Sequence, residues 1–164
     1  LRPYPESTTY ANLTANPRGV FHVTDDVLLM ARAAIGRLDT PPPLTDGPEG
    51  YPERLAQSAR WYAFEVESVD DSQVPIEIVC SVTSEGKAGE FFGLNRAKHA
   101  VLEAAILATR LRFLPIERVL DDYARLATIV EKTAAKAERT AFAELQQFIA
   151  DQLGEAETKG PQGL

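Results

Sequence analysis

The residues best suited to bind a charged ligand lie near the start of the chain, between Arg2 and Asn12. Two prolines keep this segment extended at first, because proline fixes φ and disfavours helix in the residue before it. Ser7 or Thr8 can then cap a short helix, which we expect over residues 8–15. The first N–H groups of a helix have no partner within it and lie at the positive end of its dipole. Hydroxyls and an arginine at that position suit a phosphate. The alternative is an ordinary N-cap that serves only the backbone.

A second polar group lies at Asn95 and Arg96, where a long helical pattern begins. Asn95 suits the N-cap position. An arginine in the first turn opposes the helix dipole, so a nearby anion would account for Arg96. One turn further on, His99 and Glu103 could form an oriented base pair, but an ordinary i,i+4 surface or interface pair is the favoured explanation.

Three segments, residues 7–13, 23–36 and 91–110, together resemble the DUF447 family of archaea and some bacteria. Its members are FMN-binding split β-barrels with a helical C-terminal part, related in fold to flavin reductases and to pyridoxamine-phosphate-oxidase-like proteins. The resemblance covers about residues 1–130 in the same order along the chain. It implies an α+β fold, FMN as the cofactor, and a homodimer, because related split barrels place the flavin between subunits. Family members have two or three strands before the strand that contains Arg2, so we expect these strands to be missing here.

The resemblance and the two helix starts together predict a phosphate site, whose residues are Arg2, Ser7, Thr8, Thr9, Asn95 and Arg96. Trp61, Tyr62 and Phe64 could stack on the flavin ring, but core packing also explains Tyr62 and Phe64. The sequence shows no serine-histidine-aspartate order, P-loop or dinucleotide glycine fingerprint. It therefore predicts a cofactor without naming catalytic residues. The two functional hypotheses are a flavoprotein of unknown reaction, such as an oxidoreductase, and a non-catalytic FMN-binding or dimeric scaffold protein.

Composition sets further bounds on the function. The chain has 164 residues, 45% of them apolar, which is enough for one substantial core. It has 17 basic and 24 acidic residues and a pI of about 4.9, so we expect neither nucleic acid nor an anionic membrane as a partner. Cys80 has no second cysteine to pair with. One cysteine and two histidines are too few for the four ligands of a structural zinc site. The expected compartment is the cytoplasm. The apolar run at residues 27–35 contains Arg32 and is far shorter than the ~20 residues of a membrane span.

Periodicity predicts the elements that position these residues. Alternation predicts a short strand at residues 20–23 and an antiparallel hairpin of residues 60–69 and 74–83. Helical patterns predict a helix between Thr24 as N-cap and Gly36, and three C-terminal helices. The first of these begins after Asn95 and ends near Phe113, the second covers residues 116–130, and the last ends at Gly154. A break between the last two is expected within residues 133–139, with one long helix as the alternative. The predicted domains are residues 1–92 for the split barrel, 93–154 for the helical part and 155–164 for a disordered tail.

Overall fold

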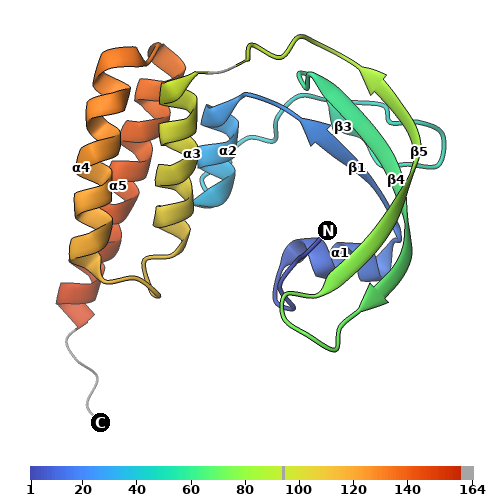
Figure 1. The fold of residues 1–164 in the computed structure, drawn as a ribbon, viewed down its shortest axis with the longest axis horizontal. Coiled ribbons are helices and arrows are strands. Elements are labelled where there is room, and N and C mark those ends of the chain that lie inside the picture. The colour runs from blue at the N-terminus through green and yellow to red at the C-terminus, as the bar shows by residue number, and fades with distance from the viewer. Residues whose placement is uncertain (94, 160–164) are drawn as a thin grey trace. The chain divides into compact units, whose positions relative to one another are not determined.

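A computed structural model of the chain describes residues 1–93 and 95–159, with side chains described as far as residue 154. The chain forms two compact units (Figure 1). The sheet unit contains residues 1–25 and 42–92, and the helical unit contains residues 26–41 and the described residues beyond 92. The protein is thus a mixed α and β structure. The chain crosses between the two units after residues 25, 41 and 92.

The centre of the sheet unit is a curved antiparallel sheet in the order β1-β4-β5 (Figure 1). Its strands are β1 (Arg18–Val23), β4 (Arg60–Asp70) and β5 (Glu77–Lys87). The predicted hairpin is confirmed as β4 and β5, although β5 begins later and runs further than its alternation indicated. The backbone of residues 1–3 lies along the free edge of β5. There the Ile78 N–H donates to the Leu1 carbonyl at 3.0 Å, and the Ile76 N–H donates to the Pro3 carbonyl at 2.9 Å.

The chain then passes from this edge of the sheet to β1 through helix α1 (Thr8–Ala15). This helix has the predicted bounds, and Ser7 is its N-cap. Two further strands, β2 (Leu44–Thr45) and β3 (Arg54–Leu55), pair with each other in a region where the sequence analysis assigned no strand. Strands of two residues are too short to show a period, so alternation could not reveal them.

His22 on β1 holds the β2–β3 segment to the sheet. Its Nε2 accepts a hydrogen bond from the Leu55 N–H at 3.0 Å. This contact requires a neutral imidazole, because a protonated nitrogen cannot accept. Burial, and secondly the nearby charge of Arg54, lowers the pKa of His22 below its ordinary value of 6.5.

The lowered pKa of His22 predicts a loss of stability in mild acid. As the pH falls below 6.5, the unfolded chain takes up the proton before the folded chain does. The free energy of unfolding should therefore fall as the pH drops from about 6.5 to the lowered pKa of His22. Well above pH 6.5 the contribution of His22 to stability should be complete. Urea denaturation of the wild type and of His22→Gln between pH 7.5 and pH about 5 checks this. A slope against pH that is the same in both proteins would show that His22 is not responsible.

The helical unit consists of four helices packed side by side (Figure 1). They are α2 (Val27–Ala34), α3 (Arg96–Thr109), α4 (Ile116–Thr133) and α5 (Lys136–Lys159). The predicted break between the last two helices is confirmed at Ala134, which has extended backbone angles. Three predicted ends were wrong. The N-cap of α2 is Asp26 and not Thr24, α3 ends at Thr109, and α5 continues through Gly154 to Lys159. The rest of the predicted tail, residues 160–164, lies outside the described residues.

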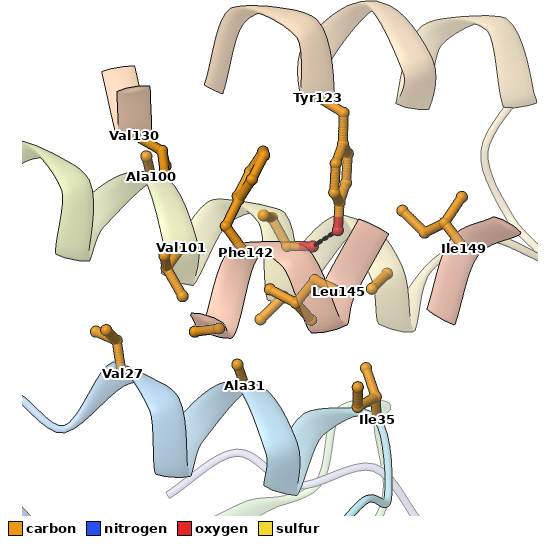
Figure 2. Packing of buried hydrophobic residues seen from close by; sticks show 14 of the residues in the cluster. Val27, Ala31, Ile35, Ala100, Val101, Tyr123, Val130, Phe142, Leu145 and Ile149 are labelled. Carbon is orange, nitrogen blue, oxygen red and sulfur yellow. Dashed lines mark hydrogen bonds between the residues drawn. The ribbon is translucent and has the colours of Figure 1, made fainter. Parts of the chain in front are cut away.

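Apolar side chains from all four helices meet in one core (Figure 2). Leu145 of α5 is completely buried, as are Val101 of α3 and Val119 of α4. Tyr123 of α4 also points into this core, and its hydroxyl donates to the Ala104 carbonyl at 2.6 Å (Figure 2). Helix α2 buries Val27, Ala31 and Ile35 here. This packing explains why α2 joins the helical unit, since its apolar face has its partners on α3 and α5.

Ion pairs at the rim of this core connect α2 and the residues after it to α5. Arg32 donates to Glu144 through Nε at 2.8 Å and through Nη2 at 2.7 Å. Arg37 donates to Asp151 at 2.6 Å. The paired guanidinium of Arg32 holds the pKa of Glu144 below its usual value. Arg32, the one charged residue in the apolar run of α2, is therefore part of a bidentate pair. Within the described residues, no helix is both long enough and apolar enough to cross a bilayer.

Candidate functional site

The start of α1 carries the hydroxyl cluster that the sequence singled out. The Ser7 hydroxyl accepts from the Tyr10 N–H at 3.2 Å and donates to the Tyr4 carbonyl at 2.7 Å. Ser7 therefore has the ordinary capping role. Thr8 and Thr9 follow as the first two residues of the helix, and both side chains are exposed. Their hydroxyls and the positive end of the helix dipole are accessible to an anion.

Arg2 lies beside β5. Its Nη2 is 3.0 Å from Glu77 Oε2, and 72% of the Arg2 side chain is exposed. An exposed pair of this kind contributes about 0–1 kcal/mol, so a doubly charged phosphate could displace the glutamate. Arg2 is thus a usable cation, but in the structure its partner is a strand carboxylate.

A groove opens along α1 on the face of the sheet that α1 covers. It has a volume of about 680 Å³ and lies between α1, β1 and the Phe64 side chain of β4. Most of its lining is apolar, and four polar side chains, Thr9, Asn12, Asn16 and Arg18, complete it. Ligand sites in proteins have volumes of about 300–1,000 Å³ and this same mixture of lining groups. The groove is therefore the candidate site, and Thr9 connects it to the hydroxyl cluster.

Two residues on neighbouring strands shape the floor of the groove. Gly19 of β1 is paired with Phe64 of β4, and the phenyl ring lies across the glycine. A Cβ atom at position 19 would lie 2.5 Å from Phe64 Cζ, so only glycine allows this close approach. Phe21 is two residues further along β1 and therefore faces the same side. It lines the groove and remains 51% exposed.

Arg18, at the edge of the groove, is held in a polar network on the opposite face of the sheet. Its Nε donates to Glu65 Oε1 at 2.8 Å, and its guanidinium lies 5.6 Å from the centre of the Tyr51 ring. The Tyr51 hydroxyl donates to Glu65 at 3.2 Å and is 2.6 Å from the Thr83 hydroxyl. The carboxylate and the ring fix the position of Arg18. The carboxylate of Glu65 compensates most of the charge of Arg18, so Arg18 is a weak candidate for binding an anionic ligand.

Asn95 and Arg96 belong to the helical unit. Asn95 Oδ1 accepts from the Lys98 N–H at 3.0 Å, which confirms Asn95 as the N-cap of α3. Arg96 is the first residue of α3, and its side chain is exposed. The structure thus places the predicted site residues at two helix starts in two different units.

The histidines and the cysteine do not gather into a site. His22 is a hydrogen-bonded strand histidine, and burial raises the pKa of the half-buried Cys80 thiol. His99 and Glu103 are both exposed. In the part of the chain that the structure describes, no group of three or more histidine, cysteine, aspartate or glutamate side chains could hold a metal ion.

Sequence reasoning missed the amides of α1 and the aromatic residue beside them. Thr9, Asn12 and Asn16 are spaced by three and four residues, which places them on one side of a helix. This signal was present in the sequence. Phe21 gave no comparable signal, because a strand phenylalanine usually belongs to a core.

Two family models match the chain, one over its N-terminal half and one over its C-terminal part. The model of the family described as "Protein of unknown function (DUF447) N-terminal domain" matches residues 1–88, and that described as "Protein of unknown function (DUF447)" matches residues 95–147. No curated protein matches the chain.

Among solved structures, the crystal structure of the FMN-bound protein MM1853 from Methanosarcina mazei, which carries the same family model, has the same fold. The TM-score is 0.77 over 90% of this chain and 80% of that chain, and the sequence identity is 22%. At this identity the likeness shows the fold alone.

Proposed function

The chain belongs to the DUF447 family. We propose that it is a flavoprotein that binds FMN through its sheet unit. The observation that carries the proposal is the apolar groove that begins at the hydroxyl cluster of α1. A phosphate group suits the cluster, and an apolar ring system suits the groove. The FMN bound to MM1853, a protein of the same fold, supports this proposal.

The flavin phosphate is proposed to bind at the start of α1. Thr8 and Thr9 contribute hydroxyls and helix N–H groups, while Ser7 holds the first turn in place through its cap. Arg2 leaves Glu77 to pair with the phosphate, because a guanidinium binds phosphate through two parallel hydrogen bonds. FMN, once bound, supplies redox chemistry through its ring, and the protein supplies binding and orientation.

Asn95 and Arg96, at the start of α3 in the helical unit, are proposed separately as anion-binding residues. The positive charge of Arg96 at the start of α3 is unfavourable in isolation, so an anion beside it would offset the cost. We further propose that the sheet unit is a split barrel and that two copies of the chain form a homodimer. Half-exposed apolar side chains on the sheet, Phe21 at 51% and Val82 at 58%, support additional burial there.

The reaction is proposed to be a flavin-dependent oxidation or reduction. A non-catalytic FMN-binding scaffold is the second hypothesis, because the described side chains supply no catalytic acid or base of evident role. Anaerobic mixing of the FMN-loaded protein with NADH or NADPH separates the two. Bleaching of the flavin absorbance supports an oxidoreductase that accepts hydride, and an unchanged spectrum with both donors supports the scaffold.

The phosphate site is tested by removing its hydroxyls. The double variant Thr8→Ala/Thr9→Ala, which leaves the Ser7 cap in place, should weaken FMN binding by about 1–3 kcal/mol, since hydrogen bonds to a charged group are lost. Riboflavin has the same ring but no phosphate, so its affinity should change much less. Fluorescence titration of both flavins measures the difference.

Thr14→Ala is the matched control, because Thr14 is at the other end of the same helix and its hydroxyl donates to the Tyr10 carbonyl. It should leave both affinities unchanged. Equal losses of FMN and riboflavin affinity in the double variant would instead indicate a disturbed helix, and an unchanged FMN affinity would remove the phosphate from this position.

A further inference from the structure

The helical unit has a groove of its own between α3 and α4, with a volume of about 370 Å³. We propose that this α3–α4 groove binds a small amphiphilic anion. The carboxylate or phosphate group of the ligand pairs with Arg110 and Arg118, and its apolar part covers Ile106. All of the lining belongs to α3, α4 and the connection between them, so the inference concerns the helical unit and does not depend on the flavin site.

Helical spacing sets the positions of the charged residues along the α3–α4 groove. Arg118, Asp122 and Arg125 are four and three residues apart, which places them on one side of α4. Arg110 follows the last residue of α3. A short connection joins the two helices, so they run antiparallel (Figure 1). Arg110 and Arg118 are therefore the two arginines at the connected end of the groove.

Charges in the groove are only loosely paired. Three arginines and two acidic residues line it, which leaves one positive charge in excess in a chain of net charge −7. Asp122 lies 4.0 Å from Arg118 Nε and 3.6 Å from Arg125 Nη1. Charge-assisted hydrogen bonds are shorter, about 2.7–2.9 Å. Arg32 of the same unit does reach its carboxylate partner, Glu144, at 2.7 and 2.8 Å. The N–H groups of Arg118 are thus available to a ligand.

Arg110 is the second available cation. Its side chain is exposed, and among the described residues no carboxylate lies within ion-pair distance of it. A positive charge is favourable at the C-terminal end of a helix, which accounts for its place at the end of α3. That interaction with the helix dipole leaves the donors of the guanidinium unused. A guanidinium can bind a carboxylate or a phosphate through two parallel hydrogen bonds.

The apolar floor indicates that the anion also has an apolar part. Leu107, Leu114 and Leu126 line the groove and pack against the core from its outer side. Ile106 beside them is 42% exposed. A ligand with an apolar part would remove this surface from water. The groove has the size of a small-molecule site, about 300–1,000 Å³. A standard protein interface is much larger, about 800 Å² on each partner, so a small molecule is the occupant that fits.

Isothermal titration calorimetry of the flavin-free protein with three ligands of the same chain length tests the proposal. Decanoate and decyl phosphate are the two anions, and decanol is the uncharged comparison. We expect saturable binding of at least one anion, with one molecule for each chain. Decanol should bind about tenfold more weakly or less, because it cannot form charge-assisted hydrogen bonds with the arginines. The anion that binds more tightly identifies the head group.

Substitution of the arginines assigns the binding to the connected end of the groove. Arg110→Gln and Arg118→Gln should each raise the dissociation constant of the better anion by about tenfold. Arg112→Gln is the matched control, because it removes the same charge from the same connection. Arg112 does not line the groove, and its guanidinium lies 4.7 Å from the centre of the Phe113 ring. The control should leave the dissociation constant within about twofold of the wild type.

Three results would overturn the proposal. The first is no saturable binding of either anion up to about 10 mM, or equal affinity for decanol. The second is the same loss of affinity in Arg112→Gln as in Arg110→Gln, since a general effect of charge would then explain the binding. The third is a change in the number of associated chains in ligand-free Arg110→Gln, measured by sedimentation, which would assign the groove to a contact between two copies. Failure to bind FMN would leave the proposal standing.

Discussion

Replacing Gly19 with valine is expected to destabilise the sheet unit by about 1–3 kcal/mol and to reduce FMN affinity at the same time. The Cβ atom would lie 2.5 Å from Phe64 Cζ and 2.9 Å from Cε1, well inside contact distance. The phenyl ring must then rotate away from β1 and into the groove. Urea denaturation measures the first effect, and flavin titration measures the second.

A second substitution separates this clash from a general intolerance of valine on β1. Phe64→Leu shortens the side chain that the new methyl groups would meet. In the double variant Gly19→Val/Phe64→Leu, the loss from Gly19→Val should be smaller than in the wild-type background by at least about 1 kcal/mol. Purely additive losses would show that Phe64 is not the obstacle, and the description of the groove floor would then be wrong.

The largest stability effect is expected from Leu145→Ala in the helical unit. Leu145 is completely buried at the centre of the four-helix core (Figure 2). Its removal loses the transfer free energy of the side chain and leaves a cavity that rigid helices fill only in part. We expect a loss of about 3–5 kcal/mol in the free energy of unfolding.

Gln146→Ala provides the control for Leu145→Ala, because the neighbouring residue on α5 is exposed. This change should stay within about 0.5 kcal/mol of the wild type. Circular dichroism at the helical wavelength during denaturation follows both variants. A loss below about 1 kcal/mol for Leu145→Ala would contradict the packing described for this core.

Local patterns predicted those elements whose signals are local. Ser7 caps α1 because a side-chain oxygen next to a helical run satisfies the first turn, and that rule needs only neighbouring residues. The β4–β5 hairpin followed from alternation in the same way. Helix α2 shows the limit of this reasoning. Its apolar face was evident, but the partners that assign it to the helical unit lie on α3 and α5, more than 60 residues away for α3.

The candidate site was predictable at one end only. The hydroxyl cluster is continuous in sequence, whereas the groove requires Thr9, Phe21 and Phe64 to come together from three elements. The pairing of Gly19 with Phe64 forms the floor of the groove. Neither strand sequence alone predicts which residues of β1 and β4 lie opposite each other. Similarly, Glu77 is 75 residues from Arg2, so the sequence could not show that this arginine has a carboxylate partner.

Native mass spectrometry of the purified protein after addition of FMN tests the central claim most directly, because it reports the cofactor and the number of chains together. The account predicts one FMN for each chain, in a species of two chains, with a flavin spectrum that differs from that of free FMN. Riboflavin should bind more weakly than FMN. A chain that shows no saturable binding of FMN up to about 1 mM would contradict the account, since such affinity is weaker than a specific cofactor site requires.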